Sequence, residues 1–264
     1  MTKTSSLRLA GVALLALCLQ TSMAGAAELK VLSTTAMTDA WQELKPKFEA
    51  TGHKIDLVLA PSGALGKRVQ DGEVADLIVT TTSGIETLTK DGKVVDGTGV
   101  GIAKSGIGVA MRKGATKPDI STPEALKQTL LGASAIAYTD PASGGASGIY
   151  FVKVLDRLGI AEEMKAKTKF GHGDPTGALV AKGEAEFAIQ QIPELMPVPG
   201  TEIVGPLSGD LQNFTRFSAG VLATSKEQDA AKALIAFLTS PDSVALLKAK
   251  GFEPADKAPP KQGS

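Results

Sequence analysis

The chain has 264 residues, of which 28 are basic and 28 acidic, with 4% aromatic residues, two histidines and one cysteine. This balance of charge argues against a nucleic-acid partner, because such proteins carry basic surfaces that neutralise phosphates. So few histidines and cysteines form no recognisable ligand spacing, and we expect neither a metal site nor another cofactor.

The N-terminal segment has the pattern of a secretory signal peptide. Two basic residues precede the apolar run Leu9–Leu19, and small residues follow it. The run is too short to span a bilayer. We therefore expect residues 1–27 to be a signal peptide that is cleaved near Ala26 or Ala27, and the mature protein to be periplasmic without membrane insertion.

Up to residue 90, short apolar runs alternate with amphipathic runs. In the first of the amphipathic runs, Trp41, Leu44 and Phe48 fall on one face of a helix. Alternation of this kind predicts a parallel sheet covered by helices. We expect strands at Leu29–Ser33, Lys54–Leu59 and Asp76–Thr80, and helices at Thr38–Ala50, Gly63–Gln70 and Gly84–Lys90.

The rest of the chain changes character. A glycine- and valine-rich run at Gly99–Met111 predicts a strand that crosses to a second lobe, and Phe214–Thr224 predicts a strand that crosses back. Between them we expect helices at Thr122–Leu131, Ser147–Leu158 and Thr176–Lys182, and strands at Ser134–Tyr138, Glu186–Gln190 and Thr201–Leu207. Two amphipathic helices, Ser225–Leu238 and Pro241–Lys250, complete the expected elements.

This order predicts an α/β protein with two lobes, each a mixed sheet flanked by helices. Residues 28–105 form the first part of lobe 1, residues 106–216 form lobe 2, and residues 217–253 return to lobe 1. Residues 254–264 are rich in proline and lysine and are expected to be a loose tail. A ligand would bind in the cleft between the lobes, near the carboxyl ends of the strands.

Small hydroxyl residues follow the first two predicted strands, at Thr34, Thr35 and Ser62. Each group opens a predicted helix, whose first backbone N–H groups have no partner within the helix. Two such helix ends aimed at one point bind an anion without a charged side chain. We therefore expect these three residues to contact a small anionic ligand, although ordinary helix N-capping uses the same residue types.

Other polar residues lie where the chain is expected to reach the cleft. Ser143 and Ser147 flank a glycine-rich turn, and Gln190 and Gln191 end a strand. His172 is a candidate acid/base residue, because the reference pKa of histidine lies near neutrality. Arg68 and Arg216 are candidate contacts to a carboxylate, the alternative being solvated surface charges.

Several short motifs resemble those of the periplasmic molybdate-binding proteins of ABC importers. Three of them follow or precede the first strands: Thr38-Asp39-Ala40, Ser62-Gly63-Ala64-Leu65 and Gly72-Glu73-Val74-Ala75-Asp76. The likeness continues in Asp140-Pro141-Ala142-Ser143, Gly148-Ile149-Tyr150, Gly177-Ala178-Leu179 and Ser240-Pro241. It implies the two-lobed periplasmic binding protein fold of the second topological type.

The ligand residues depart from that family, whose members hold an oxyanion by two serine hydroxyls, backbone N–H groups and a tyrosine hydroxyl. Ser62 matches the second serine, but Ala36 stands at the first and Gln190 at the tyrosine. Ser147 falls where a small residue donates its N–H. Pro175 falls at another expected N–H donor, and proline has none.

These departures favour an organic anion. Neutral amides suit carboxylates and hydroxyls, whereas a compact oxyanion needs only donors. The chain is similar to aconitate isomerases of this group, which implies a di- or tricarboxylate ligand and an allylic proton shift between trans- and cis-aconitate, with no metal or nucleotide. His172 or a cleft glutamate would then remove the proton. The alternatives are a molybdate or tungstate receptor that partners an ABC permease, and a carboxylate receptor without catalysis.

Overall fold

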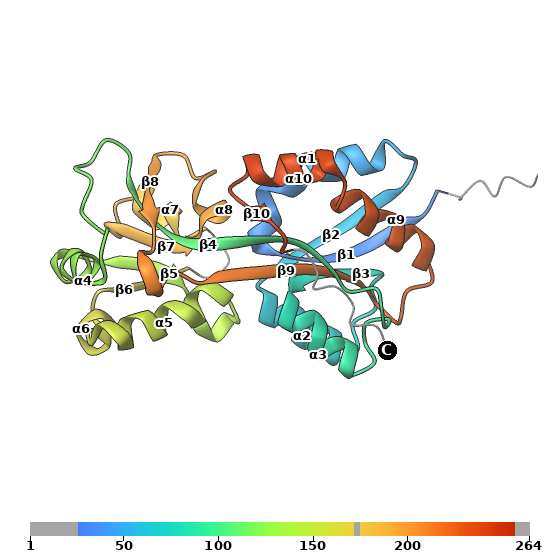
Figure 1. The fold of residues 1–264 in the computed structure, drawn as a ribbon, viewed down its shortest axis with the longest axis horizontal. Helices are drawn as coiled ribbons and strands as arrows, with labels where there is room; N and C mark the ends of the chain where they lie inside the picture. The colour runs from blue at the N-terminus through green and yellow to red at the C-terminus, as the bar shows by residue number, and fades with distance from the viewer. Residues whose placement is uncertain (1–25, 172–174, 257–264) are drawn as a thin grey trace, which may run out of the picture.

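Two α/β lobes lie side by side and are joined by long strands (Figure 1). The computed structural model describes residues 26–171 and 175–256. The predicted signal peptide up to residue 25 and His172 therefore lie outside the described residues.

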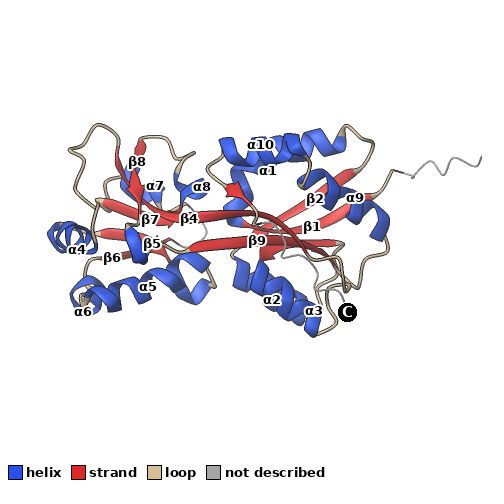
Figure 2. Ribbon diagram, in the orientation of Figure 1, coloured by secondary structure: helices blue, strands red, loops and turns tan. Residues whose placement is uncertain are grey.

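Lobe 1 begins with three parallel strands and the helices that connect them. Strand β1 pairs with both β2 and β3, and β9 returns antiparallel to β3. The helices cover both faces of this sheet (Figure 2). The elements are β1 (Glu28–Thr34), the 3-10 turn η1 (Thr35–Met37), α1 (Thr38–Glu49), β2 (Lys54–Ala60), α2 (Ser62–Gln70), β3 (Leu77–Thr81), α3 (Thr82–Lys90), β9 (Phe214–Val221), α9 (Gln228–Leu238), α10 (Pro241–Ala249) and β10 (Glu253–Pro254).

Lobe 2 is built on β5, which pairs in parallel with β6 and β7. Its core is centred on Phe151 and on Tyr138, whose rings meet edge to face at 5.2 Å. The elements are α4 (Pro123–Gly132), β5 (Ile136–Thr139), η2 (Pro141–Ser143), α5 (Ala146–Leu158), α6 (Ala161–Lys165), β6 (Thr168–Gly171), α7 (Gly177–Ala181), β7 (Phe187–Gln191), α8 (Ile192–Leu195), β8 (Thr201–Pro206) and η3 (Gly209–Leu211).

The lobes are joined by β4 (Val100–Arg112) and by β9. The first half of β4 pairs with β9 in lobe 1, with Ala103 opposite Phe217, and its second half pairs with β7 in lobe 2, with Val109 opposite Ile189. Because one strand belongs to both sheets, the carboxyl ends of β1, β2, β5 and β7 are brought to the junction between the lobes.

The predicted alternation of strands and helices up to residue 90 is confirmed, and Trp41 shows why it holds. Its side chain is buried in the lobe 1 core with Leu44 and Phe48. Its indole Nε1 donates a hydrogen bond of 2.8 Å to Ser33 Oγ, so this buried polar group is satisfied. The apolar spacing seen in the sequence therefore sets the face of α1 that packs on the sheet.

Several observed boundaries differ from the predicted ones by one to three residues, and two differences have a physical reason in the structure. Helix α9 begins at Gln228 rather than at Ser225. The Ser225 hydroxyl donates to Asp76 and accepts from the N–H of Glu227, which holds this segment in a turn. Pro254, at the start of the expected loose tail, belongs to β10 and pairs with Ala103 of β4. Residues 257–264 lie outside the described part of the chain.

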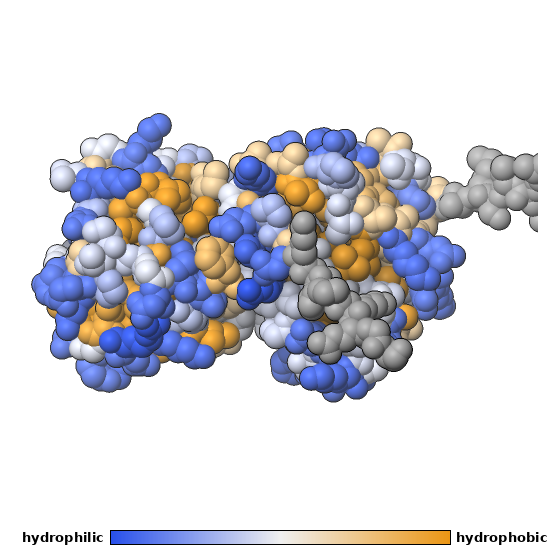
Figure 3. All heavy atoms as spheres, viewed as in Figure 1, coloured by the Kyte–Doolittle hydropathy of each residue, from blue (hydrophilic) through white to orange (hydrophobic). Residues whose placement is uncertain are grey.

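The surface narrows between the lobes, and hydrophilic residues gather over this waist on the face that Figure 3 shows. Within residues 26–171 and 175–256, no single helix is long and apolar enough to cross a bilayer. Helices α9 and α10 together have the required length and hydropathy, but the chain bends by 59° between them.

Candidate functional site

Helices α2 and α5 begin at the junction between the lobes. In the first turn of α2, the N–H of Gly63 donates across the junction to the carbonyl of Gly144 at 3.1 Å. Helix α2 follows Pro61 and helix α5 follows Gly145, and neither N-cap residue has a side-chain cap. A small cavity of about 20 Å³ lies between these helix ends and is lined by Thr34, Ser62 and Ser147 among others. The helix dipoles make this point favourable for negative charge.

The hydroxyls predicted from the sequence meet in this small cavity. Ser62 Oγ donates to Thr34 Oγ1 at 3.0 Å, and both residues are buried. Thr80 Oγ1 in turn donates to the backbone carbonyl of Ser62 at 3.3 Å. The Ser62 proton is thus used by Thr34, which leaves the hydroxyl proton of Thr34 as the one that can be donated to a ligand.

A second, larger cavity adjoins the first and has a volume of about 390 Å³. Thr35, Pro61, Thr139 and Glu194 line both cavities, so they form one continuous site. The volume lies within the range of small-molecule sites, whereas the smaller cavity holds little more than a water molecule. No lysine or arginine of the described residues lines either cavity.

The carboxylate of Glu194 lies where the two cavities meet. It is on α8, the short helix that directly follows β7. Its Oε1 accepts hydrogen bonds from Thr35 Oγ1 at 3.1 Å and from Gln190 Nε2 at 2.9 Å. Burial raises the pKa of this carboxyl from its ordinary value of 4.5 to about 7, although the two hydrogen bonds act in the opposite direction.

The two glutamines at the end of β7 face different parts of the site, as strand alternation requires. Gln190 lines the larger cavity, and its Oε1 accepts from the N–H and the hydroxyl of Thr176, at 3.0 and 2.7 Å. Gln191 lines the smaller one, and its Nε2 donates to Thr215 Oγ1 at 2.7 Å. Both predicted glutamines therefore reach the site.

Two buried polar atoms at the smaller cavity have no hydrogen-bond partner among the described residues: Gln191 Oε1 and Thr139 Oγ1. Because the Thr215 hydroxyl can accept as well as donate, a half-turn of the Gln191 amide would keep that contact and present Nε2 instead. Unpaired buried polar groups are costly, so a ligand that pairs with them gains affinity.

The remaining predicted residues lie elsewhere. Ser143 Oγ donates to the backbone carbonyl of Asp140 at 2.7 Å and lines neither cavity. Arg68 forms an ion pair with Glu73 on lobe 1. Arg216 pairs with Asp256 and lines a different hollow of the protein. His172 lies outside the described residues.

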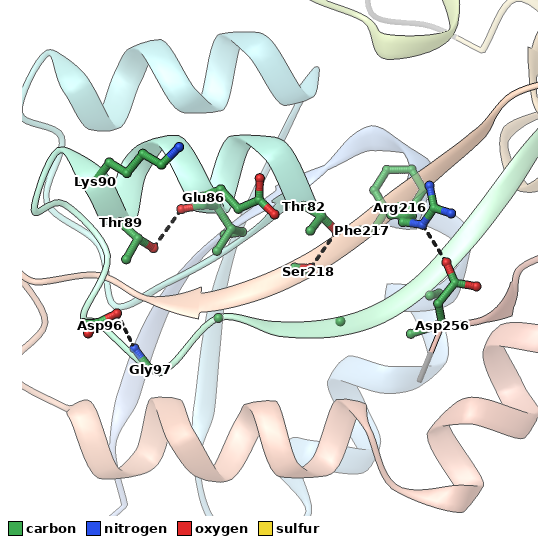
Figure 4. A pocket seen from close by; sticks show the side chains of 15 residues that line it. Thr82, Glu86, Thr89, Lys90, Asp96, Gly97, Arg216, Phe217, Ser218 and Asp256 are labelled. Carbon is green, nitrogen blue, oxygen red and sulfur yellow. Dashed lines mark hydrogen bonds and ion pairs between the residues drawn. The ribbon is translucent and has the colours of Figure 1, made fainter. Parts of the chain in front are cut away.

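That other hollow, of about 660 Å³, lies on lobe 1 between α3 and the strands β4 and β9 (Figure 4). Some of its polar groups pair with one another: Thr82 hydrogen-bonds Ser218 at 2.8 Å, and Arg216 hydrogen-bonds Asp256. None of the helix N-termini described above opens into it. We therefore place the candidate site at the junction of the lobes, although that space is smaller.

Several polar residues of the site were missed in the sequence or not placed by it, among them Thr139, Thr215 and Glu194; Thr38, Asp39 and Gln42 also line the larger cavity. Thr139 ends β5 and Thr215 lies near the start of β9, so each marks a strand end that faces the junction. Glu194 lies four residues after Gln190, but Gln190 belongs to β7 and only Glu194 is on α8, so no helical turn relates them. The available signal was a carboxylate shortly after two glutamines at a strand end, but the helix that carries it has only 4 residues.

No group of three or more His, Cys, Asp or Glu residues in the described part of the chain is arranged to hold a metal ion. The site therefore offers hydroxyls, amides, backbone N–H groups and one carboxyl whose pKa is near neutrality. Such a set can bind carboxylates and exchange a proton with a bound molecule.

The chain is similar to known bacterial proteins over most of its length. Residues 29–253 match the family described as bacterial extracellular solute-binding protein. An aconitate isomerase from Pseudomonas sp is 36% identical over 88% of this chain and 89% of its own length. A molybdate-binding protein from Azotobacter vinelandii is 28% identical over 87% of this chain and 91% of its own.

Solved structures agree with the fold. The periplasmic molybdate-binding protein of Azotobacter vinelandii superposes with a TM-score of 0.71 and 19% identity, covering 85% of this chain and 98% of that one. The predicted resemblance to molybdate-binding proteins and the predicted α/β periplasmic-binding fold are therefore confirmed.

Proposed function

The chain belongs to the bacterial extracellular solute-binding protein family, and we propose that it binds a small organic polycarboxylate between its lobes and interconverts trans- and cis-aconitate. Its family and its N-terminal sequence support a periplasmic location. The ligand would be enclosed as the lobes close around it, which excludes water from the site.

One observation carries this proposal: the continuous interlobe site combines helix N-termini with amides and has room for an organic acid. The larger cavity measures about 390 Å³, and Gln190 lies on its wall. The unpartnered atoms of Gln191 and Thr139 supply further hydrogen-bonding groups at the inner end. Carboxylates placed at the helix ends would be held by N–H groups, with no arginine needed.

The relationship to the Pseudomonas protein supports the catalytic part of the proposal, because the two chains align over nearly their whole lengths. A transport receptor with this fold would deliver its ligand to a membrane permease. An isomerase has no need of that partner. No lysine or arginine of the described residues lines the two cavities. This favours a site in which bound protons neutralise part of the negative charge of the ligand and of the site carboxyls.

The test is direct. The mature protein is incubated with trans-aconitate, and proton NMR follows the appearance of cis-aconitate. In parallel, thermal unfolding is measured with trans-aconitate, cis-aconitate, citrate, molybdate, tungstate and sulfate, because a ligand that binds only the folded state raises the melting temperature. We expect conversion and a stabilisation by the aconitates. Stabilisation by molybdate alone, without conversion, would refute the proposal.

A molybdate or tungstate receptor is the second candidate, favoured by the Ser62–Thr34 hydroxyl pair at the uncapped end of α2. For that function, Ser62→Ala should abolish binding of molybdate, because it removes the hydroxyl that fixes Thr34 Oγ1, whose proton is the one left to donate to an oxyanion. Isothermal titration of the wild-type protein and of this variant with molybdate separates the two functions.

A further inference from the structure

We propose that Glu194 is the catalytic residue that removes the allylic proton of aconitate and returns it to the neighbouring carbon, and that Thr35 and Gln190 are positioning residues for its carboxylate. This inference rests on the proposed isomerase function. The comparisons assign no role to any residue of this site. The sequence predicted His172 or a cleft glutamate as the base, and it gave no position for the glutamate.

The geometry of the carboxylate supports this role. Thr35 and Gln190 both donate to Oε1, at 3.1 and 2.9 Å. No described residue hydrogen-bonds to Oε2. Glu194 lines both cavities, so this second oxygen is the one available to a bound molecule. The carboxylate is thus held by one oxygen and can act with the other.

The two positioning residues come from opposite lobes. Thr35 follows β1 in lobe 1, whereas Gln190 and Glu194 belong to β7 and α8 of lobe 2. The hydrogen bond from Thr35 therefore exists only while the lobes are closed. Closure around a ligand would complete the arrangement of the acid/base group at the moment when water is excluded.

The electrostatic surroundings support a group that both takes and gives a proton. The pKa of Glu194 is raised by burial to about 7, so both forms are populated at neutral pH. Asp39 on α1 is the other charged residue that lines the larger cavity in the described part of the chain. Lys250 neutralises it at 3.0 Å, and Glu43 shares the same lysine at 2.8 Å.

The reaction needs no other reactant. Ionised Glu194 takes a proton from the methylene carbon of trans-aconitate, and the C–H electron pair becomes delocalised over the allyl system and its carboxylates. The helix N-termini stabilise this charge. The protonated carboxyl then gives a proton to the carbon that began as the vinyl CH, and the double bond shifts by one position. One proton is removed and one is added, so no oxidant or reductant is required.

The first variant is Glu194→Gln, which keeps Oε1 as the acceptor for Thr35 and Gln190 but cannot take a proton. We expect its turnover of trans-aconitate to fall at least about 100-fold. Its affinity for trans-aconitate, measured by isothermal titration, should equal or exceed that of the wild type, because a negative charge has left the site. The matched control is Glu86→Gln on α3, an exposed carboxylate that lines the lobe 1 hollow; it should turn over at the wild-type rate.

The second variant is Thr35→Val, which tests positioning. The Thr35 hydrogen bond lowers the pKa of Glu194, so its loss should move the rising limb of the pH–rate profile to higher pH. A merely structural role for Thr35 would lower the rate without moving this limb.

Each outcome decides one of the two proposals. A wild-type protein without isomerase activity overturns the proposed function together with this inference. An active wild type with a Glu194→Gln variant that keeps turnover within about tenfold overturns the inference alone. A variant that is inactive because it no longer binds trans-aconitate also overturns it, since Glu194 would then be a binding residue.

Discussion

Replacing Glu194 with glutamine should make the protein more stable at alkaline pH, independently of any activity. Burial raises the pKa of this carboxyl from 4.5 to about 7. Between these values the folded protein binds a proton that the unfolded chain has released, so the free energy of unfolding falls as the pH rises. Below about pH 4.5 both states are protonated and the effect vanishes.

The size of the effect follows from the same shift. A difference between 4.5 and about 7 corresponds to about 3 kcal/mol, since each factor of ten in an acid constant is worth about 1.4 kcal/mol. The wild type loses this much stability by about pH 8, whereas Glu194→Gln has no charge to desolvate and loses none. For a protein of this size the gain in melting temperature is roughly 6–12 °C.

The assay is thermal unfolding of the ligand-free protein, followed by circular dichroism at about pH 4.5, 6 and 8. The melting temperature of Glu194→Gln minus that of the wild type should be near zero at the lowest pH and greatest at the highest. Glu86→Gln, at an exposed position, should follow the wild type throughout. Parallel curves for Glu194→Gln and the wild type would refute the claim that burial perturbs this carboxyl.

Two glycines yield further predictions. A Cβ at Gly63 would lie 3.0 Å from the Cα of Gly144 on the other lobe, so Gly63→Ala should hinder closure and weaken aconitate binding by about tenfold in titration calorimetry. The melting temperature of unliganded Gly63→Ala should hardly change. The control is Gly66→Ala, where a Cβ meets nothing within 4 Å and which should bind aconitate like the wild type. Equal affinities of Gly63→Ala and the wild type would contradict the closure argument. A Cβ at Gly148 would lie 1.9 Å from the carbonyl oxygen of Thr139, so Gly148→Ala should cost about 3 kcal/mol or more in urea unfolding, and a loss below about 1 kcal/mol would show that α5 shifts freely.

Local patterns in the sequence predicted most of the elements but missed the shortest ones. Trp41, Leu44 and Phe48 recur at helical spacing, and the structure buries all three in one core. Helix α8 spans only 4 residues, fewer than two turns, so no periodicity develops in it. Strand β10 has 2 residues and exists because β4 offers it an edge.

The candidate site was predictable where it depends on the ends of strands and helices. Thr34, Thr35 and Ser62 follow parallel strands, so their convergence at one edge of a sheet was expected, and these residues line the small cavity. The arginines were less predictable. Arg68 lies in the second turn of α2, a helix that begins at the site, but its guanidinium forms an ion pair with Glu73 on lobe 1.

The sequence by itself determined the order of strands and helices, the apolar faces that bury them, and the hydroxyls at the first helix ends. These features depend on neighbours within one or two turns of the chain. Only the tertiary structure decided that Thr35 donates to Glu194, 159 residues away, and that Gln190 bonds the same oxygen. That contact requires two lobes to meet across a shared strand, and the same burial shifts the pKa of the carboxyl, because desolvation depends on atoms brought from distant parts of the chain.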